Sequence, residues 1–152
     1  MPNTYSQIYI HVVFAVKGRR NLVDKSWREE LYKYITGTVQ NKRNKMISIG
    51  GIEDHIHMLI GLNPSQVLSD LVRDVKVSST LFINKNRFVM RGFQWQEGYG
   101  AFTISREDIP AVAHYIENQE RHHKRQSFED EYKDILDENG IEYEERFLFE
   151  WL

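Results

Sequence analysis

The chain has 152 residues, which suits one domain with a buried core better than two very small domains. It contains no cysteine, so disulfide bonds and thiolate metal sites are excluded. No apolar run is long enough to cross a membrane, and the start of the chain lacks the basic and apolar layout of a secretory signal. We therefore expect a cytoplasmic protein with no membrane partner.

The formal net charge of −2 hides an uneven distribution of charge. Residues 127–152 carry ten acidic and two basic side chains, a net charge of −8, whereas residues 1–126 carry eighteen basic and twelve acidic ones, a net charge of +6. The basic clusters lie at residues 17–20, 42–45, 85–91 and 121–125. A basic body favours a polyanionic partner, although such clusters are also common on domains that bind no nucleic acid.

The first part of the chain alternates between strand and helix patterns. Residues 5–16 have a period of two and many β-branched and aromatic side chains, which predicts a strand. Residues 25–41 have apolar side chains at helical spacing, with Asp24 as the expected N-cap. Residues 45–52 and 55–62 predict two further strands, and the short link between them indicates an antiparallel pair.

A second helix is expected over residues 63–86, with Asn63 as its cap and Pro64 at its first position. Residues 93–105 then predict a strand that is interrupted by glycines, with a hairpin as the alternative.

A third helix is expected over residues 106–124, capped by Ser105, and a short one at about residues 128–138. The order βαββαβ followed by helices predicts an α+β fold of the ferredoxin-like, or split βαβ, type. Its antiparallel sheet has the first and third strands at the centre and two helices on one face.

Two histidines stand two residues apart in the third predicted strand. Because side chains alternate along a strand, His55 and His57 share one face of the sheet, opposite Ile56 and Met58. If the apolar face packs against the two helices, the histidines lie on the open face, where the third helix can cover them. Taken alone, the pair fits a metal site and a site without metal about equally well.

The third predicted helix places Tyr115 and Gln119, four residues apart, on the border of its apolar stripe. Two imidazoles and one oxygen suit a divalent ion such as Mg²⁺ or Mn²⁺, with positions left for phosphate oxygens. Tyr115 is then a candidate nucleophile, although a phenol with a pKa near 10 must first be activated. Asp54 either shapes the turn before the strand or supports a ligand histidine.

His55-Ile56-His57, followed by Tyr115 and Gln119 on a helix, resembles the motifs of the single-tyrosine transposases of the HUH nuclease superfamily, the insertion-sequence type. The segment GYGAFTIS at residues 98–105 and the opening YIHVVFAVKGRR also resemble that family. The resemblance covers roughly residues 5–126.

This resemblance implies cleavage and rejoining of single-stranded DNA through a 5′-phosphotyrosine on Tyr115, with His55, His57 and Gln119 as ligands of Mg²⁺ or Mn²⁺. It implies DNA hairpins at the ends of the mobile element, no nucleotide triphosphate, and a homodimer whose sheets join edge to edge. We assign residues 1–126 to the transposase domain. Residues 127–152 form an acidic tail, which is part of the same domain, a dimer brace, a DNA mimic or a solvated helix.

Several basic, histidine and aromatic side chains are candidates for DNA contacts. His11 fits a structural or phosphate-facing role better than ligation, and His122 is also a reserve metal ligand. His123 is expected to face DNA or solvent. The DNA-binding candidates are His11, Arg19, Arg20, Lys76, Arg87, Trp95, His122 and Lys124.

Two other functions stay open. A non-catalytic, domesticated protein would keep hairpin binding and form no covalent adduct. A replication initiator or relaxase of the same superfamily is less compatible with so short a chain, because such proteins usually carry further domains.

Overall fold

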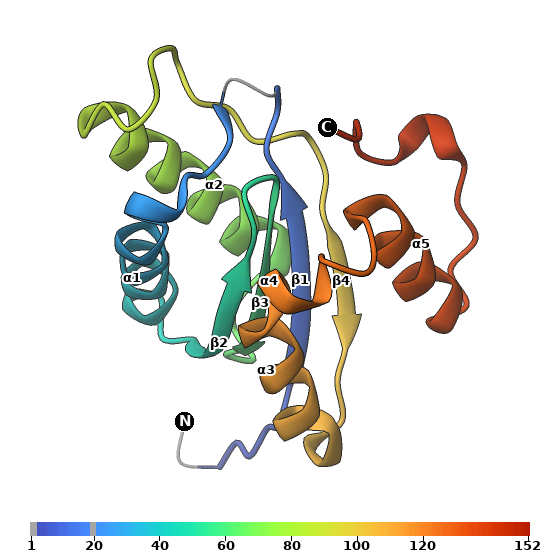
Figure 1. The fold of residues 1–152 in the computed structure, drawn as a ribbon. Coiled ribbons are helices and arrows are strands. Elements are labelled where there is room, and N and C mark those ends of the chain that lie inside the picture. Colours follow the sequence, from blue (N-terminus) through green and yellow to red (C-terminus); the bar gives the residue numbers. More distant parts are fainter. Residues whose placement is uncertain (1–2, 19–20) are drawn as a thin grey trace.

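The computed structural model describes residues 3–18 and 21–152, in which a four-stranded antiparallel sheet forms the centre (Figure 1). The strands are β1 (Tyr9–Ala15), β2 (Lys45–Gly51), β3 (His55–Gly61) and β4 (Gly100–Thr103), in the order β2-β3-β1-β4. The first and third strands are central, and Val13 of β1 lies opposite His57 of β3. The α+β class and the ferredoxin-like arrangement expected from the sequence are confirmed.

Helices α1 (Lys25–Asn41) and α2 (Leu68–Lys85) cover one face of this sheet (Figure 1). The carboxylate of Asp24 accepts a hydrogen bond of 2.8 Å from the backbone N–H of Ser26, so α1 has the cap that the sequence predicts. No helix in the described ranges is long and apolar enough to span a bilayer. The buried side chains between sheet and helices include Val12, Phe14, Ile56, Met58, Ile60, Leu31, Ile35, Leu71 and Val75.

The other face of the sheet is covered by the later part of the chain (Figure 1). This part consists of the 3₁₀ turn η2 (Arg106–Asp108), α3 (Ile109–Glu117), α4 (Gln119–His122), α5 (Phe128–Glu138) and the 3₁₀ turn η3 (Glu145–Phe147). A second apolar cluster joins α5 and the chain end to β1 and β4 through Val13, Ala15, Phe102, Phe128, Tyr132, Leu136 and Phe149. The acidic tail is therefore packed against the sheet by the apolar side of α5.

The second helix starts later than the sequence predicts. It begins at Leu68, with Val67 in the cap position, and not at Pro64. The side chain of Asn63 accepts a hydrogen bond of 2.9 Å from the N–H of Ser65, and this short-range bond shapes a turn. An asparagine before a proline occurs in turns as well as at helix caps. The predicted start of this helix at Pro64 was therefore wrong.

The expected strand over residues 93–105 is reduced to β4. Trp95 forms only an isolated bridge with Val16, and Gly98 has a φ of +81°, which does not fit a strand. No hairpin forms in this described segment, because β4 pairs with β1.

The expected third helix is divided into η2, α3 and α4. Ser105 does not cap a backbone N–H; its hydroxyl donates a hydrogen bond of 3.0 Å to Asp108. Asn118, with φ −107° and ψ 28°, separates α3 from α4 and turns Gln119 inward to 1% exposure. Helix α3 lies so close to β2 that a Cβ on Gly50 would be 2.2 Å from the carbonyl oxygen of Ile116. A glycine is needed at this contact.

Candidate metal and nucleophile site

His55 and His57 lie on the sheet face that α3, α4 and α5 cover, and both are fully buried. Nδ1 of His55 is 2.7 Å from Oδ1 of Asp54, and Nδ1 of His57 is 2.8 Å from Nε2 of His11. Partners on Nδ1 orient a histidine and leave its Nε2 free for a ligand. Asp54 thus contacts a candidate ligand, and His11, which is 5% exposed, supports the other from the neighbouring strand.

Helices α3 and α4 bring the predicted nucleophile and the third ligand to the histidine pair. Oε1 of Gln119 lies 3.0 Å from Nε2 of His55. The ring of Tyr115 stands edge-on to that of His57, with centroids 5.7 Å apart. Tyr115, Gln119 and the two histidines therefore meet within a single chain.

Glu131 of α5 occupies the centre of this group and is not among the site residues predicted from the sequence. Its side chain is 2% exposed, and Oε1 lies 3.1 Å from Nε2 of His57 and 3.3 Å from Nε2 of His55. Its Oε2 accepts hydrogen bonds from the hydroxyl of Tyr115 and from Nε2 of Gln119. Glu131 lies three residues after Phe128, on the buried side of an amphipathic helix. An acidic residue at an apolar position of a helix is the signal that could have identified it.

The two histidines after Gln119 also reach this group. Nε2 of His123 is 2.9 Å from Oε1 of Gln119 and 3.2 Å from Oε1 of Glu131. The side chain of His123 is only 5% exposed, so the expectation that it faces DNA or solvent was wrong. Nε2 of His122 is 3.3 Å from Oε2 of Glu131, without the geometry of a hydrogen bond.

The donor set fits a divalent ion. Nε2 of His55, Nε2 of His57 and a carboxylate oxygen of Glu131 all lie within 4.8 Å of one another. Imidazole nitrogens suit Mn²⁺, while the oxygens of Gln119 and Glu131 suit Mn²⁺ and Mg²⁺ alike. The three residues that the sequence predicts as ligands are thus together, and a carboxylate joins them.

Burial and neighbouring charges set the protonation of the site. Burial acts to lower the pKa of His55, but hydrogen bonds to Asp54 and Glu131 outweigh it and raise that pKa to about 9. Burial lowers the pKa of His57 to about 4. Burial and the nearby His57 lower the pKa of His11 to about 3. Without an ion, the site therefore pairs a charged His55 with Glu131, and an ion would displace the proton of His55.

Glu131 and Tyr115 are held in opposite protonation states. Burial alone would raise the pKa of Glu131, but hydrogen bonds from His123, His55 and His57 hold that pKa far below its usual range. Burial and the charge of Glu131 both raise the pKa of Tyr115 well above its usual value. The phenol therefore stays protonated until an ion or a base helps to remove its proton.

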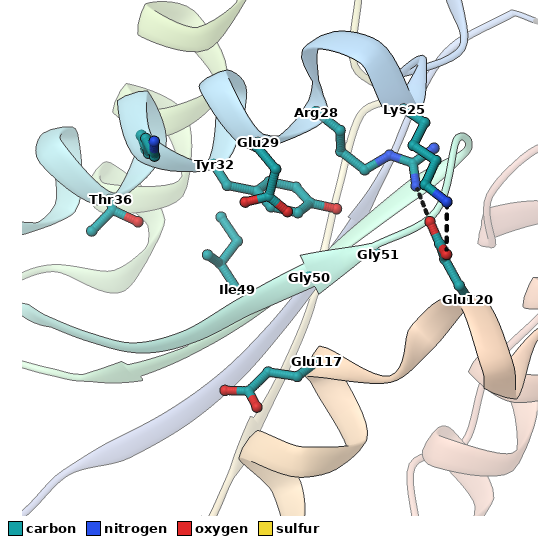
Figure 2. Close-up of a pocket in the computed structure, with 11 residues that line it drawn as sticks. Lys25, Arg28, Glu29, Tyr32, Thr36, Ile49, Gly50, Gly51, Glu117 and Glu120 are labelled. Carbon is teal, nitrogen blue, oxygen red and sulfur yellow. Dashed lines mark hydrogen bonds and ion pairs between the residues drawn. The ribbon is translucent and has the colours of Figure 1, made fainter.

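A group of ion pairs at the edge strand β2 connects α4 to α1. Glu120 accepts hydrogen bonds of 3.2 Å from Nη1 of Arg28 and 3.4 Å from Nζ of Lys25. Figure 2 shows these three side chains meeting beyond the end of β2, next to Gly51. Arg28 is buried and also donates to the carbonyl oxygen of Val23, at 3.0 Å. Because Glu120 follows Gln119 directly, this contact helps to fix the third predicted ligand.

The remaining DNA-binding candidates are dispersed. Trp95 is 8% exposed and donates to Oγ of Ser79 at 2.9 Å, so this candidate for DNA contact packs in the core. The ammonium of Lys76 donates to the carbonyl oxygens of Gln96 and Gly98, at 2.8 and 2.7 Å. Arg87 and Lys124 are exposed, and Arg19 and Arg20 lie outside the described residues.

A histidine pair on a central strand that faces a tyrosine on a helix is the arrangement expected of a single-tyrosine transposase. Residues 4–119 match the family model described as "Transposase IS200 like". Since this match spans most of the chain, the protein belongs to the IS200-like transposase family, and the predicted membership is confirmed. The matched range includes the histidine pair, Tyr115 and Gln119, and it ends before Glu131.

Individual proteins are also similar to this chain. The ISDra2 transposase TnpA of Deinococcus radiodurans is 23% identical over 118 residues, which are 74% of this chain and 84% of that protein. A crystal structure from Deinococcus radiodurans R1, assigned as a transposase, has a TM-score of 0.62 at 20% identity and covers 77% of this chain and 94% of that one. A REP-associated tyrosine transposase bound to a REP hairpin has a TM-score of 0.56 at 15% identity, covering 75% and 67%. The two structures share the fold of this chain.

Proposed function

We propose that this transposase cleaves and rejoins single-stranded DNA at hairpin-marked ends of a mobile element, through a 5′-phosphotyrosine on Tyr115. The observation that carries the proposal is the position of Tyr115 beside His55, His57 and Gln119 within one chain. Phosphodiester cleavage requires a nucleophile and a group that stabilises negative charge on the phosphate. This site offers a phenol, nitrogen and oxygen donors for a metal ion, and a buried carboxylate.

In the proposed reaction, the phenol oxygen of Tyr115 attacks phosphorus and loses its proton. A bond forms between this oxygen and phosphorus, the bond from phosphorus to the 3′ oxygen breaks, and that oxygen takes up a proton. The phosphotyrosine keeps the energy of the phosphodiester, so a 3′-hydroxyl can reverse the reaction without a nucleotide triphosphate.

His55, His57 and Gln119 would hold Mg²⁺ or Mn²⁺ through Nε2, Nε2 and Oε1. A bound ion supplies polarisation of the phosphodiester and compensates its negative charge. Asp54 and His11 keep the two imidazoles oriented, as their contacts with Nδ1 indicate.

The surroundings of Tyr115 favour a bound cation when DNA approaches. The pocket beside Tyr115 is lined by several acidic side chains, namely Asp108, Glu131, Asp134 and Glu138. A phosphate that enters this pocket is repelled unless positive charge is supplied. We therefore expect cleavage to depend on a divalent ion.

The DNA partner and the oligomeric state are further parts of the proposal. The structural relative bound to a REP hairpin supports a hairpin substrate for this chain. We infer phosphate contacts from exposed Arg87 and Lys124 on the surface. The edge strands β2 and β4 are the candidates for a homodimer whose sheets join.

The direct test uses a labelled single-stranded hairpin oligonucleotide with Mn²⁺, followed by a denaturing gel. We expect a protein–DNA adduct that EDTA prevents. The alternative, a non-catalytic hairpin-binding protein, gives binding that is indifferent to EDTA and no adduct with any oligonucleotide.

A further inference from the structure

The carboxylate of Glu131 is placed as a metal ligand would be. Its Oε1 is 3.1 Å from Nε2 of His57, 3.3 Å from Nε2 of His55 and 3.2 Å from Nε2 of His123. Two atoms that bind one Mg²⁺ at about 2.1 Å and at right angles are about 3.0 Å apart. The three distances from Oε1 are therefore close to an edge of an octahedral coordination shell, and the donor atoms of His55, His57 and Glu131 all lie within 4.8 Å of one another.

Three imidazole nitrogens converge on Oε1 of Glu131, whereas a carboxylate oxygen offers about two lone-pair directions. Nε2 of His57 and Nε2 of His123 are hydrogen-bonded to this oxygen, and Nε2 of His55 pairs with Oε1 of Gln119 at 3.0 Å. On Oε2, the hydroxyl of Tyr115 and the amide of Gln119 already donate, and the buried Nε2 of His122 has no hydrogen-bond partner. A cation bound between Oε1 and these nitrogens would take the place of the ring protons that point at this oxygen, including the proton of His55.

We propose that the acidic tail completes the metal site, with Oε1 of Glu131 as a ligand in addition to His55 and His57. This inference rests on the proposed metal-dependent function. The other oxygen of the same carboxylate holds the hydroxyl of Tyr115, so one residue connects the ion to the nucleophile. Glu131 lies beyond the residues that match the family model, and the site of this chain therefore includes a segment outside that match.

The test is the affinity of the metal-free full chain for Mn²⁺, measured by isothermal titration calorimetry without DNA. Glu131→Gln keeps the size of the side chain and removes its charge. We expect it to weaken Mn²⁺ binding more than about tenfold, since even residues that only support ligands contribute 10- to 100-fold. Asp130→Asn is the matched control, because it removes the same charge from an exposed position of α5.

A thermal melt of each variant, with and without Mn²⁺, gives a second measurement. We expect Mn²⁺ to raise the melting temperature of the wild type and of Asp130→Asn, and to raise that of Glu131→Gln far less. If Glu131→Gln folds too poorly for titration, Glu131→Asp takes its place. Aspartate keeps the negative charge, but its side chain is one methylene shorter, so its carboxylate lies farther from the histidines. Weaker Mn²⁺ binding is again expected.

Equal Mn²⁺ affinity of the wild type and both Glu131 variants would overturn the inference. So would tighter binding with more adduct, because Glu131 would then obstruct the site. A wild type that binds no Mn²⁺ also overturns it. The proposed function fails separately, if the wild type binds Mn²⁺ but forms no adduct with hairpin DNA.

Discussion

The hydroxyl of Tyr115 donates a hydrogen bond to the carboxylate of Glu131, so the candidate nucleophile of α3 is paired with the acidic tail. The same carboxylate contacts His55 and His57 through its other oxygen. The tail is thus connected to the candidate site by a specific contact as well as by the apolar packing of α5. A charge-rich segment that follows a catalytic motif can be part of the site itself.

Tyr115→Phe tests the nucleophile. We expect this variant to form no covalent adduct, because it lacks the attacking oxygen, while hairpin binding stays unchanged. The measurement is a denaturing gel for the adduct and a mobility shift for binding. Tyr34→Phe is the control, since Tyr34 is partly exposed on α1 and stacks on Phe82. An adduct formed by Tyr115→Phe would place the nucleophile elsewhere.

His57→Ala tests the metal site. Loss of a ligand should reduce Mn²⁺-dependent adduct formation by more than about 100-fold, because residues that only support ligands already contribute 10- to 100-fold. His114→Ala is the control, an exposed histidine on α3. Rates of adduct formation over a series of Mn²⁺ concentrations give the comparison. Cleavage by His57→Ala at the wild-type rate would reject the histidine pair as the site.

Gly50→Ala tests the close approach of α3 to β2. The new Cβ would lie 2.2 Å from the carbonyl oxygen of Ile116, so α3 must shift and carry Tyr115 with it. We expect the free energy of unfolding to fall by about 1–3 kcal/mol or more, together with a loss of adduct formation. Denaturant unfolding provides the measurement.

The control for this change is Gly37→Ala in α1, where an added Cβ meets no atom within 4 Å. Alanine favours a helix interior over glycine by about 0.5–1 kcal/mol, so this variant should be more stable than the wild type. Equal stabilities of Gly50→Ala and the wild type would contradict the packing described for α3.

Arg28→Ala tests the contact that ties α4 to α1. The change removes hydrogen bonds to Glu120 and to the carbonyl oxygen of Val23. Hydrogen bonds that involve a charged group contribute about 1.5–3 kcal/mol, and we expect a loss of stability in this range in denaturant unfolding. Lys25→Ala, whose side chain is 79% exposed, should change stability by less than about 0.5 kcal/mol. Similar losses of stability in the two variants would show that the buried hydrogen bonds of Arg28 do not contribute more to the free energy of unfolding than the exposed contact of Lys25.

The sheet and the histidine pair could be predicted because both depend on local pattern. Alternation along β3 puts Ile56 and Met58 on one face and His55 and His57 on the other, whatever packs above. The helical spacing of Tyr115 and Gln119 predicts that their side chains lie close together. In the structure a break at Asn118 separates α3, which carries Tyr115, from α4, which carries Gln119. The two side chains still lie close together, because both donate a hydrogen bond to Oε2 of Glu131.

The missed features depend on tertiary packing. Glu131 reaches the site only because the apolar side of α5 docks on the sheet, and no local pattern gives the direction of that docking. Trp95 stands between polar residues near a glycine, as an exposed aromatic often does, yet Ser79 and the core enclose it. Asn63 and Pro64 have the composition of a helix start, but the hydrogen bonds that Asn63 accepts from Ser65 and Gln66 form a turn.

In the proposed reaction, Tyr115 attacks DNA while a metal is held at the histidine pair. Mass spectrometry of protease-digested adduct, formed with a hairpin oligonucleotide and Mn²⁺, tests it most directly. We expect a nucleotide linked through its 5′ phosphate to the peptide that contains Tyr115, and none after EDTA. A modification on another residue, or an adduct that forms equally well in EDTA, would contradict it.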